Sequence, residues 1–340
     1  MNPNEYYYRK VIGAIGASLL FFLLFINLFG VLITFLPVFL TVFSFGETAI
    51  TVIYQLVYAA GYLLCFMLPV PILKALIGKK GYPYRPMRAQ LRLSPWVLLI
   101  IPAGIAVVYS AANVNATFVS IFDYSTFSSE FLWGTSTDQP KLYQWVLEFI
   151  VLCAVPGFCE EFLFRGAILT NCLPFGRSNA VLISAFLFAM MHQNAEQVLY
   201  TFAAGIVLGI VYERTGNIWA CTILHILNNF ASLHQSAVVY KLQSFFSSTV
   251  AVALLEAALF TLGLISLAIL IAHFFSQKTT CRDGFFGKDL PASDGYATYP
   301  ISGKRAVTLF LTPCMIIFLV ICILQILFLL WMAVMYGLFV

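Results

Sequence analysis

The chain alternates between long runs of apolar residues and shorter polar segments. The runs are too long, and alternate too poorly between apolar and polar positions, to form the strands of a membrane barrel. Helices are then the remaining structure in which every backbone N–H and C=O group can form a hydrogen bond in lipid. We therefore predict an all-α fold, a polytopic transmembrane helix bundle of about nine spans, with eight as the lower limit. The candidate spans are 11–43, 48–73, 95–118, 142–172, 178–192, 196–213, 217–233, 248–275 and 306–338. One of the three short spans in the middle is a candidate for a re-entrant segment.

The composition agrees with lipid as the main solvent of this protein. Hydrophobic residues make up 61% of the 340 residues and charged residues only 9%, whereas a soluble domain carries about 25% charged residues. The eight cysteines are scattered and form no CxxC pair, which argues against a disulfide scaffold or a thiolate zinc site. The net charge of +4 comes from basic residues beside the spans, so we expect no nucleic-acid partner.

The polar segments divide the chain into three parts. Residues 1–141 hold the first spans and a basic loop. Residues 142–233 hold the polar residues that are candidates for catalysis, and residues 234–340 hold the last spans. The segment 276–305 is rich in Gly, Pro and Asp, which favours a loop between the last two spans. No polar stretch is long enough to build a soluble core.

The charges of the loops predict the orientation in the membrane. Arg9 and Lys10 precede the first span, and the loop after the second span is strongly basic, while the loop around 123–140 is acidic. By the positive-inside rule, the N-terminus is cytoplasmic and the C-terminus lies outside the cell membrane. The first apolar run is longer than the core of a signal peptide and no small-residue cleavage site follows it, so we expect it to be retained.

The stretch CEEFLFRG places three charged residues inside an apolar span. A charged side chain at mid-bilayer costs about 2.5–3.5 kcal/mol, so Glu160, Glu161 and Arg165 indicate a site. Glu161 and Arg165 lie four residues apart and share a helix face, which favours an ion pair. The side chain of Glu160 points about 100° around the helix from that of Glu161, so its carboxylate is outside this ion pair and available for a reaction. Pro156 and Gly157 interrupt the helix just before this stretch and favour a kink.

Two histidines in later spans are candidate partners of the free glutamate. His192 follows Phe188 by four residues, and His225 precedes Asn229 by four residues. Glutamate, histidine and asparagine in one site are the groups that activate water and stabilise an oxyanion. Glu160, His192 and His225 are also candidate ligands of Zn²⁺ or another divalent metal, because zinc accepts histidine nitrogen and carboxylate oxygen.

Glycines predict tight contacts between the spans that carry these residues. Gly205 and Gly209 form a small-xxx-small pair, which allows a close helix contact. Gly216 suits the end of one helix and Asn217 the N-cap of the next.

These residues form a pattern that resembles the CPBP family of intramembrane proteases. This family includes the CAAX-prenyl endopeptidases and bacterial abortive-infection or bacteriocin-immunity homologues. The resemblance covers roughly residues 142–233. It rests on three motifs in order, EExxxR, FxxxH and HxxxN, at Glu160, Glu161 and Arg165, at Phe188 and His192, and at His225 and Asn229.

The resemblance implies hydrolysis of a peptide bond in a membrane-associated protein or peptide, which for CAAX-type enzymes is prenylated. In that picture Glu160 and His192 activate a water, and His225 and Asn229 stabilise the oxyanion. Glu161 and Arg165 hold the site in shape. The family is often called metalloproteases, yet no HExxH motif is present and the sequence leaves the metal open.

A second class of function remains open from the sequence alone. A non-enzymatic carrier or an immunity-type binding protein would also use buried glutamate and histidine. The chain shows no pseudo-repeated halves, which a transporter would be expected to have. A thiol protease at Cys159 is disfavoured, because no basic residue lies four positions away from it to activate the thiol. The sequence gives no oligomeric state.

Overall fold

A computed structural model describes most of the chain, and all of its regular elements are helices. The described residues are 1–78, 83–87, 89, 97–120, 142–246, 250, 254, 257–258, 260–266, 268–269, 299, 301 and 303–339. The predicted all-α class is confirmed for these residues, which form no strand beyond one isolated bridge between Ala89 and Asn217. The acidic loop around 123–140, most of the span 248–275 and most of the loop 276–305 lie outside the described residues.

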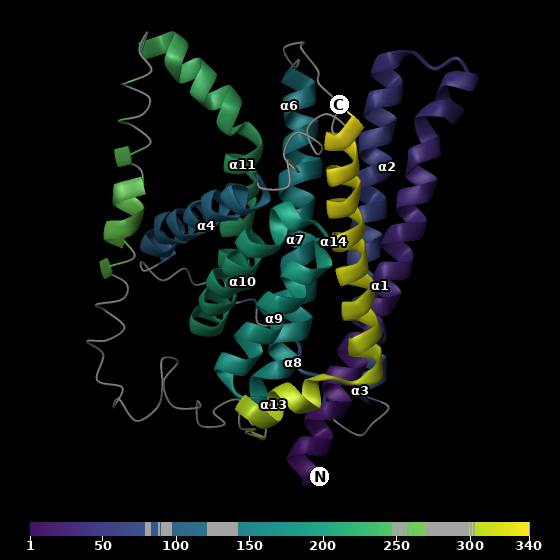
Figure 1. The fold of residues 1–340 in the computed structure, drawn as a ribbon, viewed down its shortest axis with the longest axis vertical. Helices are drawn as coiled ribbons and strands as arrows, with labels where there is room; N and C mark the ends of the chain where they lie inside the picture. The colour runs from purple at the N-terminus through teal and green to yellow at the C-terminus, as the bar shows by residue number, and fades with distance from the viewer. Residues whose placement is uncertain are drawn as a thin grey trace.

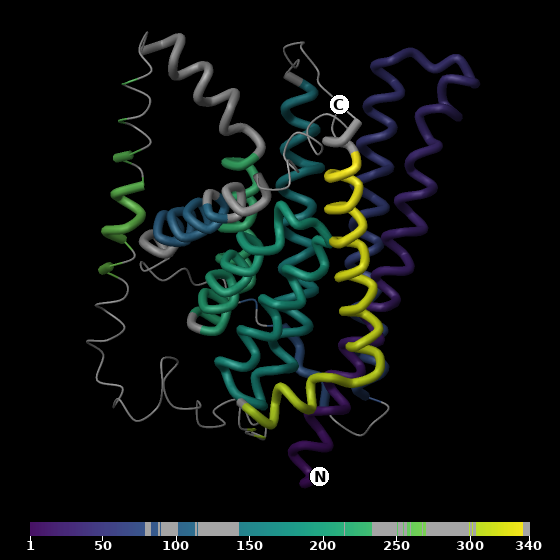
Figure 2. Tube along the Cα trace, viewed as in Figure 1, coloured from purple at the N-terminus to yellow at the C-terminus, as the bar shows by residue number. Residues whose placement is uncertain are grey.

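Three long helices run side by side and form one side of the molecule (Figure 1): α1 (Pro3–Val42), α2 (Glu47–Met67) and α14 (Pro313–Phe339). The purple N-terminal helix and the yellow C-terminal helix can be followed next to each other in Figure 2. Two short helices extend this group, α3 (Pro69–Gly78) after α2 and α13 (Gly303–Phe310) before α14. In Figure 1, α13 lies across the lower end of the bundle, and α14 turns upward from it.

The predicted span 142–172 forms one continuous helical path that changes its width. In order it contains α6 (Leu142–Glu148), η2 (Phe149–Ala154), α7 (Val155–Glu161), η3 (Phe162–Leu169), α8 (Thr170–Cys172) and η4 (Leu173–Phe175). The segments η2 and η3 are π-helical, a wide form that often occurs at functional sites. Pro156 follows η2 and removes a backbone donor there. The helix accommodates this proline by widening to the π form in η2, just before it. The interruption predicted at Pro156 and Gly157 is therefore a local change of helix width, and the helix continues through both residues.

Three further helices pack around this path: α9 (Arg177–Met191), α10 (Ala195–Thr215) and α11 (Ile218–Phe246), with α4 (Val97–Ser120) against α10. A Cβ on Gly205 would lie 2.8 Å from the Cα of Ala185, so this glycine lets α9 and α10 come into close contact. The close helix contact predicted at the small pair is confirmed there.

The turn between α10 and α11 has the predicted caps. Gly216 has φ 59°, a left-handed conformation that glycine adopts without steric cost. The side chain of Asn217 accepts a hydrogen bond of 3.0 Å from the backbone N–H of Trp219, as an N-cap does.

The number of spans is not confirmed. Within the described ranges, four helices are long and apolar enough to cross a membrane, namely Pro3–Val42, Glu47–Gly78, Ala195–Glu213 and Pro313–Met335. The last predicted span, 306–338, is instead two helices, because the chain leaves the helical path at Leu311 and Thr312 before Pro313. The span predicted at 178–192 corresponds to α9, whose 15 residues extend about 22 Å, less than the roughly 30 Å of the hydrocarbon core.

The two ends of the chain lie at opposite ends of the molecule (Figure 1), and the apolar helices identify an integral membrane protein. The face on which each terminus lies stays a prediction.

Candidate active site

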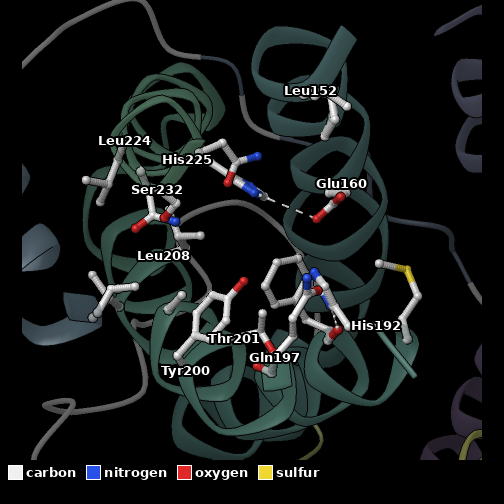
Figure 3. Close-up of a pocket in the computed structure, with 18 of the residues that line it drawn as sticks. Leu152, Glu160, His192, Gln197, Tyr200, Thr201, Leu208, Leu224, His225 and Ser232 are labelled. Atoms are coloured by element: carbon white, nitrogen blue, oxygen red, sulfur yellow. Dashed lines mark hydrogen bonds and ion pairs between the residues drawn. The ribbon is translucent and has the colours of Figure 1, made fainter. Parts of the chain in front are cut away.

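The structure brings residues from three motifs to one cavity. Glu160 in α7, His192 in the turn after α9, and His225 and Asn229 in α11 line a cavity of about 580 Å³ (Figure 3). His192 is the C-cap of α9, where the chain turns toward α10.

An ion pair lies beside this cavity and is fully buried. The Nη1 of Arg165 donates to Oε1 of Glu161 at 2.8 Å, and both side chains are 0% exposed. Its Nη2 donates to the carbonyl of Gly205 at 3.2 Å, and its guanidinium lies 4.6 Å above the ring of Phe188. The predicted contact between Glu161 and Arg165 is therefore present, and it joins α7 and η3 to α9 and α10.

Glu161 has a second partner that the spacing of the motif did not indicate. The Nδ1 of His225 donates to the same Oε1 of Glu161 at 2.8 Å. This bond fixes the imidazole so that its Nε2 lies 3.7 Å from Oε2 of Glu160 (Figure 3). One carboxylate thus orients the histidine that faces the other carboxylate.

A glycine allows this arrangement of glutamates and histidine. A Cβ on Gly157 would lie 2.6 Å from Cγ1 of Ile226 and 3.2 Å from its backbone nitrogen. Only a residue without a side chain lets α7 and α11 approach so closely. Ile226 follows His225 directly, so the contact at Gly157 sets the distance between the imidazole and the glutamates.

The two oxygens of Glu160 have different surroundings. Its Oε1 accepts a short hydrogen bond from the hydroxyl of Tyr62 in α2. Its Oε2 is buried and has no hydrogen-bond partner among the described residues. A buried carboxylate with one oxygen held and the other open is suited to accept a proton from a bound water.

His192 is oriented by the residue one turn before it. Its Nδ1 donates to the backbone carbonyl of Phe188 at 2.8 Å, so in the neutral ring Nε2 is the acceptor. The ring of Phe188 makes edge contacts with both imidazoles, at centroid distances of 4.8 Å to His192 and 5.8 Å to His225. The FxxxH spacing therefore supplies both a carbonyl for His192 and a ring that separates the two histidines.

Several other polar side chains that line the cavity were missed from the sequence. Tyr62 comes from α2, Gln197 and Tyr200 come from α10, and Asn228 precedes Asn229 in α11. Gln197 and Asn228 interrupt or border apolar runs, which is the signal that could have found them, whereas the two tyrosines give no such signal.

A metal ion would need three side chains that point to one position. In the parts of the chain described here, no group of three or more His, Cys, Asp and Glu side chains is arranged to hold a metal. The Nδ1 atoms of His192 and His225 are hydrogen-bonded, and Oε1 of Glu160 is held by Tyr62, which leaves Nε2 of each histidine and Oε2 of Glu160 as the atoms that a metal would bind. The ligand set of Glu160, His192 and His225 stays a prediction.

The helices and this cavity define a helical integral membrane protein with a buried glutamate–histidine site. Residues 142–231 match the family model described as type II CAAX prenyl endopeptidase Rce1-like. This match confirms the resemblance to the CPBP family, at nearly the boundaries predicted. No curated protein and no solved structure matched the chain. All six predicted site residues lie inside the matched segment, and Tyr62 lies outside it.

Proposed function

We propose that this protein is an intramembrane endopeptidase that cleaves a peptide bond in a membrane-associated protein or peptide of the prenylated CAAX type. The observation that carries the proposal is the open oxygen of Glu160, which lies in one cavity with His192, His225 and Asn229. The match to an endopeptidase family supports an enzyme over a carrier or a binding protein.

In the proposed reaction, Glu160 is the general base. A water near Oε2 of Glu160 attacks the carbonyl carbon of the scissile bond and gives its proton to this carboxylate. The Nε2 of His192, free of the bond to Phe188, accepts a hydrogen bond from the same water and orients it. The protonated Glu160 then gives the proton to the leaving amine, which restores the carboxylate.

His225 and Asn229 stabilise the tetrahedral intermediate in this proposal. Two carboxylates and one guanidinium, those of Glu160, Glu161 and Arg165, lie together in an apolar site. His225 donates Nδ1–H to Glu161, and its Nε2 supplies a donor to the oxyanion when it carries a proton. The amide of Asn229, one turn further along α11, supplies a second donor. An oxyanion donor in a site that excludes water contributes about 10²–10³ in rate.

The experiment that tests the proposal uses the full chain in lipid nanodiscs. Peptides that end in a CAAX sequence, with a farnesylated or an unmodified cysteine, are incubated with the protein, and the products are identified by mass spectrometry. We expect cleavage after the prenylated cysteine and a loss of about 10²–10⁴ in kcat for Glu160→Gln. Glu47→Gln makes the same change at an exposed position at the start of α2 and should keep the wild-type rate. Undiminished cleavage by Glu160→Gln would overturn the mechanism.

Two further arms of this assay separate the remaining parts of the proposal. Equal cleavage of both peptides would keep the endopeptidase and reject the prenylated substrate. Treatment of the wild type with a strong chelator, followed by re-addition of Zn²⁺, tests the predicted metal. A loss of activity that zinc restores would establish a metal as part of the site.

A further inference from the structure

The hydrogen bond between Tyr62 and Glu160 joins the matched segment to a helix outside it. Tyr62 lies in α2, 98 residues before Glu160, and its hydroxyl donates to Oε1. The other oxygen of Glu160, Oε2, has no partner among the described residues and faces Nε2 of His225. A carboxylate that is held at one oxygen alone can turn only about that bond, so the donor decides where the second oxygen points.

The ring of Tyr62 is held in place by its neighbours on the same helix. It stacks on Tyr58 at a centroid distance of 6.0 Å and on Phe66 at 4.6 Å, with interplanar angles of 28° and 26°. These residues are four apart and therefore lie above one another on one helix face. Phe66 is in turn packed edge-on against Phe22 of α1 at 4.7 Å. The phenol thus has little freedom to swing away from the glutamate.

The position of α2 itself is fixed by α1 at the same level. A Cβ on Gly61 would lie 2.1 Å from the ring of Phe29, so the glycine next to Tyr62 makes room for this ring. Packing between the two helices places the hydroxyl, and a buried tyrosine hydroxyl usually finds a hydrogen-bond partner. Here that partner is Glu160.

We propose that Tyr62 is a positioning residue, whose hydroxyl holds Oε1 of Glu160 so that Oε2 faces the water and His225. The inference rests on the proposed function, because it assigns Tyr62 a role through Glu160. A neutral donor suits this role, since it orients the carboxylate without cancelling the charge that takes up the proton. An arginine or lysine in its place would pair with the base and compete with the water.

The test compares two tyrosines of the same helix. Tyr62→Phe keeps the stacked ring and removes only the hydroxyl. A hydrogen bond to a charged group contributes enough that we expect kcat to fall about 10- to 100-fold, with KM unchanged because the hydroxyl is bonded to Glu160 and the ring that lines the cavity is kept. Tyr54→Phe makes the same change in a ring that stacks on Tyr58 but does not line the cavity, and it should keep wild-type kcat and KM. A wild-type kcat in Tyr62→Phe, or an equal loss in both variants, would overturn the inference.

A second measurement is independent of activity. Melting of the wild type, Tyr62→Phe, Glu160→Gln and the double variant forms a double-mutant cycle. We expect non-additive changes, because the two side chains are in direct contact. Additive changes would overturn the contact. If the wild type cleaves no peptide, the proposed function fails, and the cycle still decides whether Tyr62 holds Glu160.

Discussion

Two ion pairs of nearly the same length lie in opposite surroundings in this protein. Arg165 and Glu161 are 2.8 Å apart, and both side chains are 0% exposed. Arg305 and Glu5 are 2.7 Å apart, where α13 meets the start of α1, and their side chains are 46% and 16% exposed. Distance alone would make the two pairs equivalent.

The difference lies in what else each pair must satisfy. Glu5 also takes part in the capping box of α1 with Asn2, so water and the helix end share its charge. In Glu161, by contrast, one oxygen accepts hydrogen bonds from both Arg165 and His225, and no part of the side chain is exposed to water that could screen its charge. Removing a partner from a buried pair leaves an uncompensated charge, whereas an exposed pair contributes little. The buried pair is therefore expected to control both stability and the orientation of the site.

The largest effect is expected from Glu161→Gln. An amide of the same shape no longer balances the charge of Arg165 and weakens the hydrogen bond that orients the imidazole of His225. Since loss of a group that orients a catalytic histidine has cost about 10⁴ in other enzymes, we expect kcat for peptide cleavage to fall by about 10²–10⁴. Glu5→Gln, the same change in the exposed pair, should keep the wild-type kcat. Equal rates in the two variants would contradict the division between the pairs.

Arg165→Ala should be the most destabilising change. The variant leaves the carboxylate of Glu161 buried without the guanidinium of Arg165, which lowers the free energy of unfolding by about 3–5 kcal/mol. It also removes the donor to the carbonyl of Gly205. The measurement is the free energy of unfolding in mixed detergent micelles. A loss below about 1 kcal/mol, the range of an exposed pair, would show that water reaches this site.

A glycine-to-alanine pair tests the packing that surrounds the buried charges. Gly157→Ala forces a methyl group against Ile226, and overpacking of this kind costs about 1–3 kcal/mol. Gly30→Ala is the matched control, because a Cβ there meets nothing within 4 Å. In the helix α1 this change should stabilise by about 0.5–1 kcal/mol. Opposite signs for the two variants are the expected outcome, and the same sign for both would contradict the close contact of α7 with α11.

Arg305→Ala is expected to have the smallest effect. An exposed pair contributes about 0–1 kcal/mol, and salt screens it further. Unfolding of the wild type and of the variant should differ less at high salt than at low salt. A difference that salt leaves unchanged would mean that the pair is more buried in the membrane than its exposure here indicates.

The sequence indicated which residues gather at one cavity better than it indicated their contacts. Spacing of four residues is a local signal, so the pair of Glu161 and Arg165 followed from helix geometry alone. The bond from His225 to Glu161 depends on how α11 approaches α7, and no periodicity within one helix contains that information. Tyr62 was missed for the same reason, since it reaches the site from a different helix, and a tyrosine in an apolar span is too ordinary to stand out.

For the fold too, the local signal was predicted from the sequence and the contacts between helices were not. Apolar runs predicted where helices lie, because lipid leaves the backbone few alternatives. They did not predict where one run is divided into two helices, as happens before Pro313. The short run at 178–192 was predicted at nearly the bounds of α9, but hydropathy alone cannot separate such a helix from one that crosses the membrane.

The π-helical segments on both sides of α7 determine the direction in which the side chains of α7 point. A residue added to or removed from a helix turns everything on one side of it by about 100° relative to the other side. The seven residues of α7 that carry both glutamates lie between η2 and η3, so the lengths of these two wide segments set the rotational phase of α7. A deletion of one residue in η2 or η3 would leave every side chain of the site in the sequence, yet it would aim Glu160 and Glu161 at different neighbours. The site is therefore encoded in the count of apolar residues around it as much as in the identity of its charged ones.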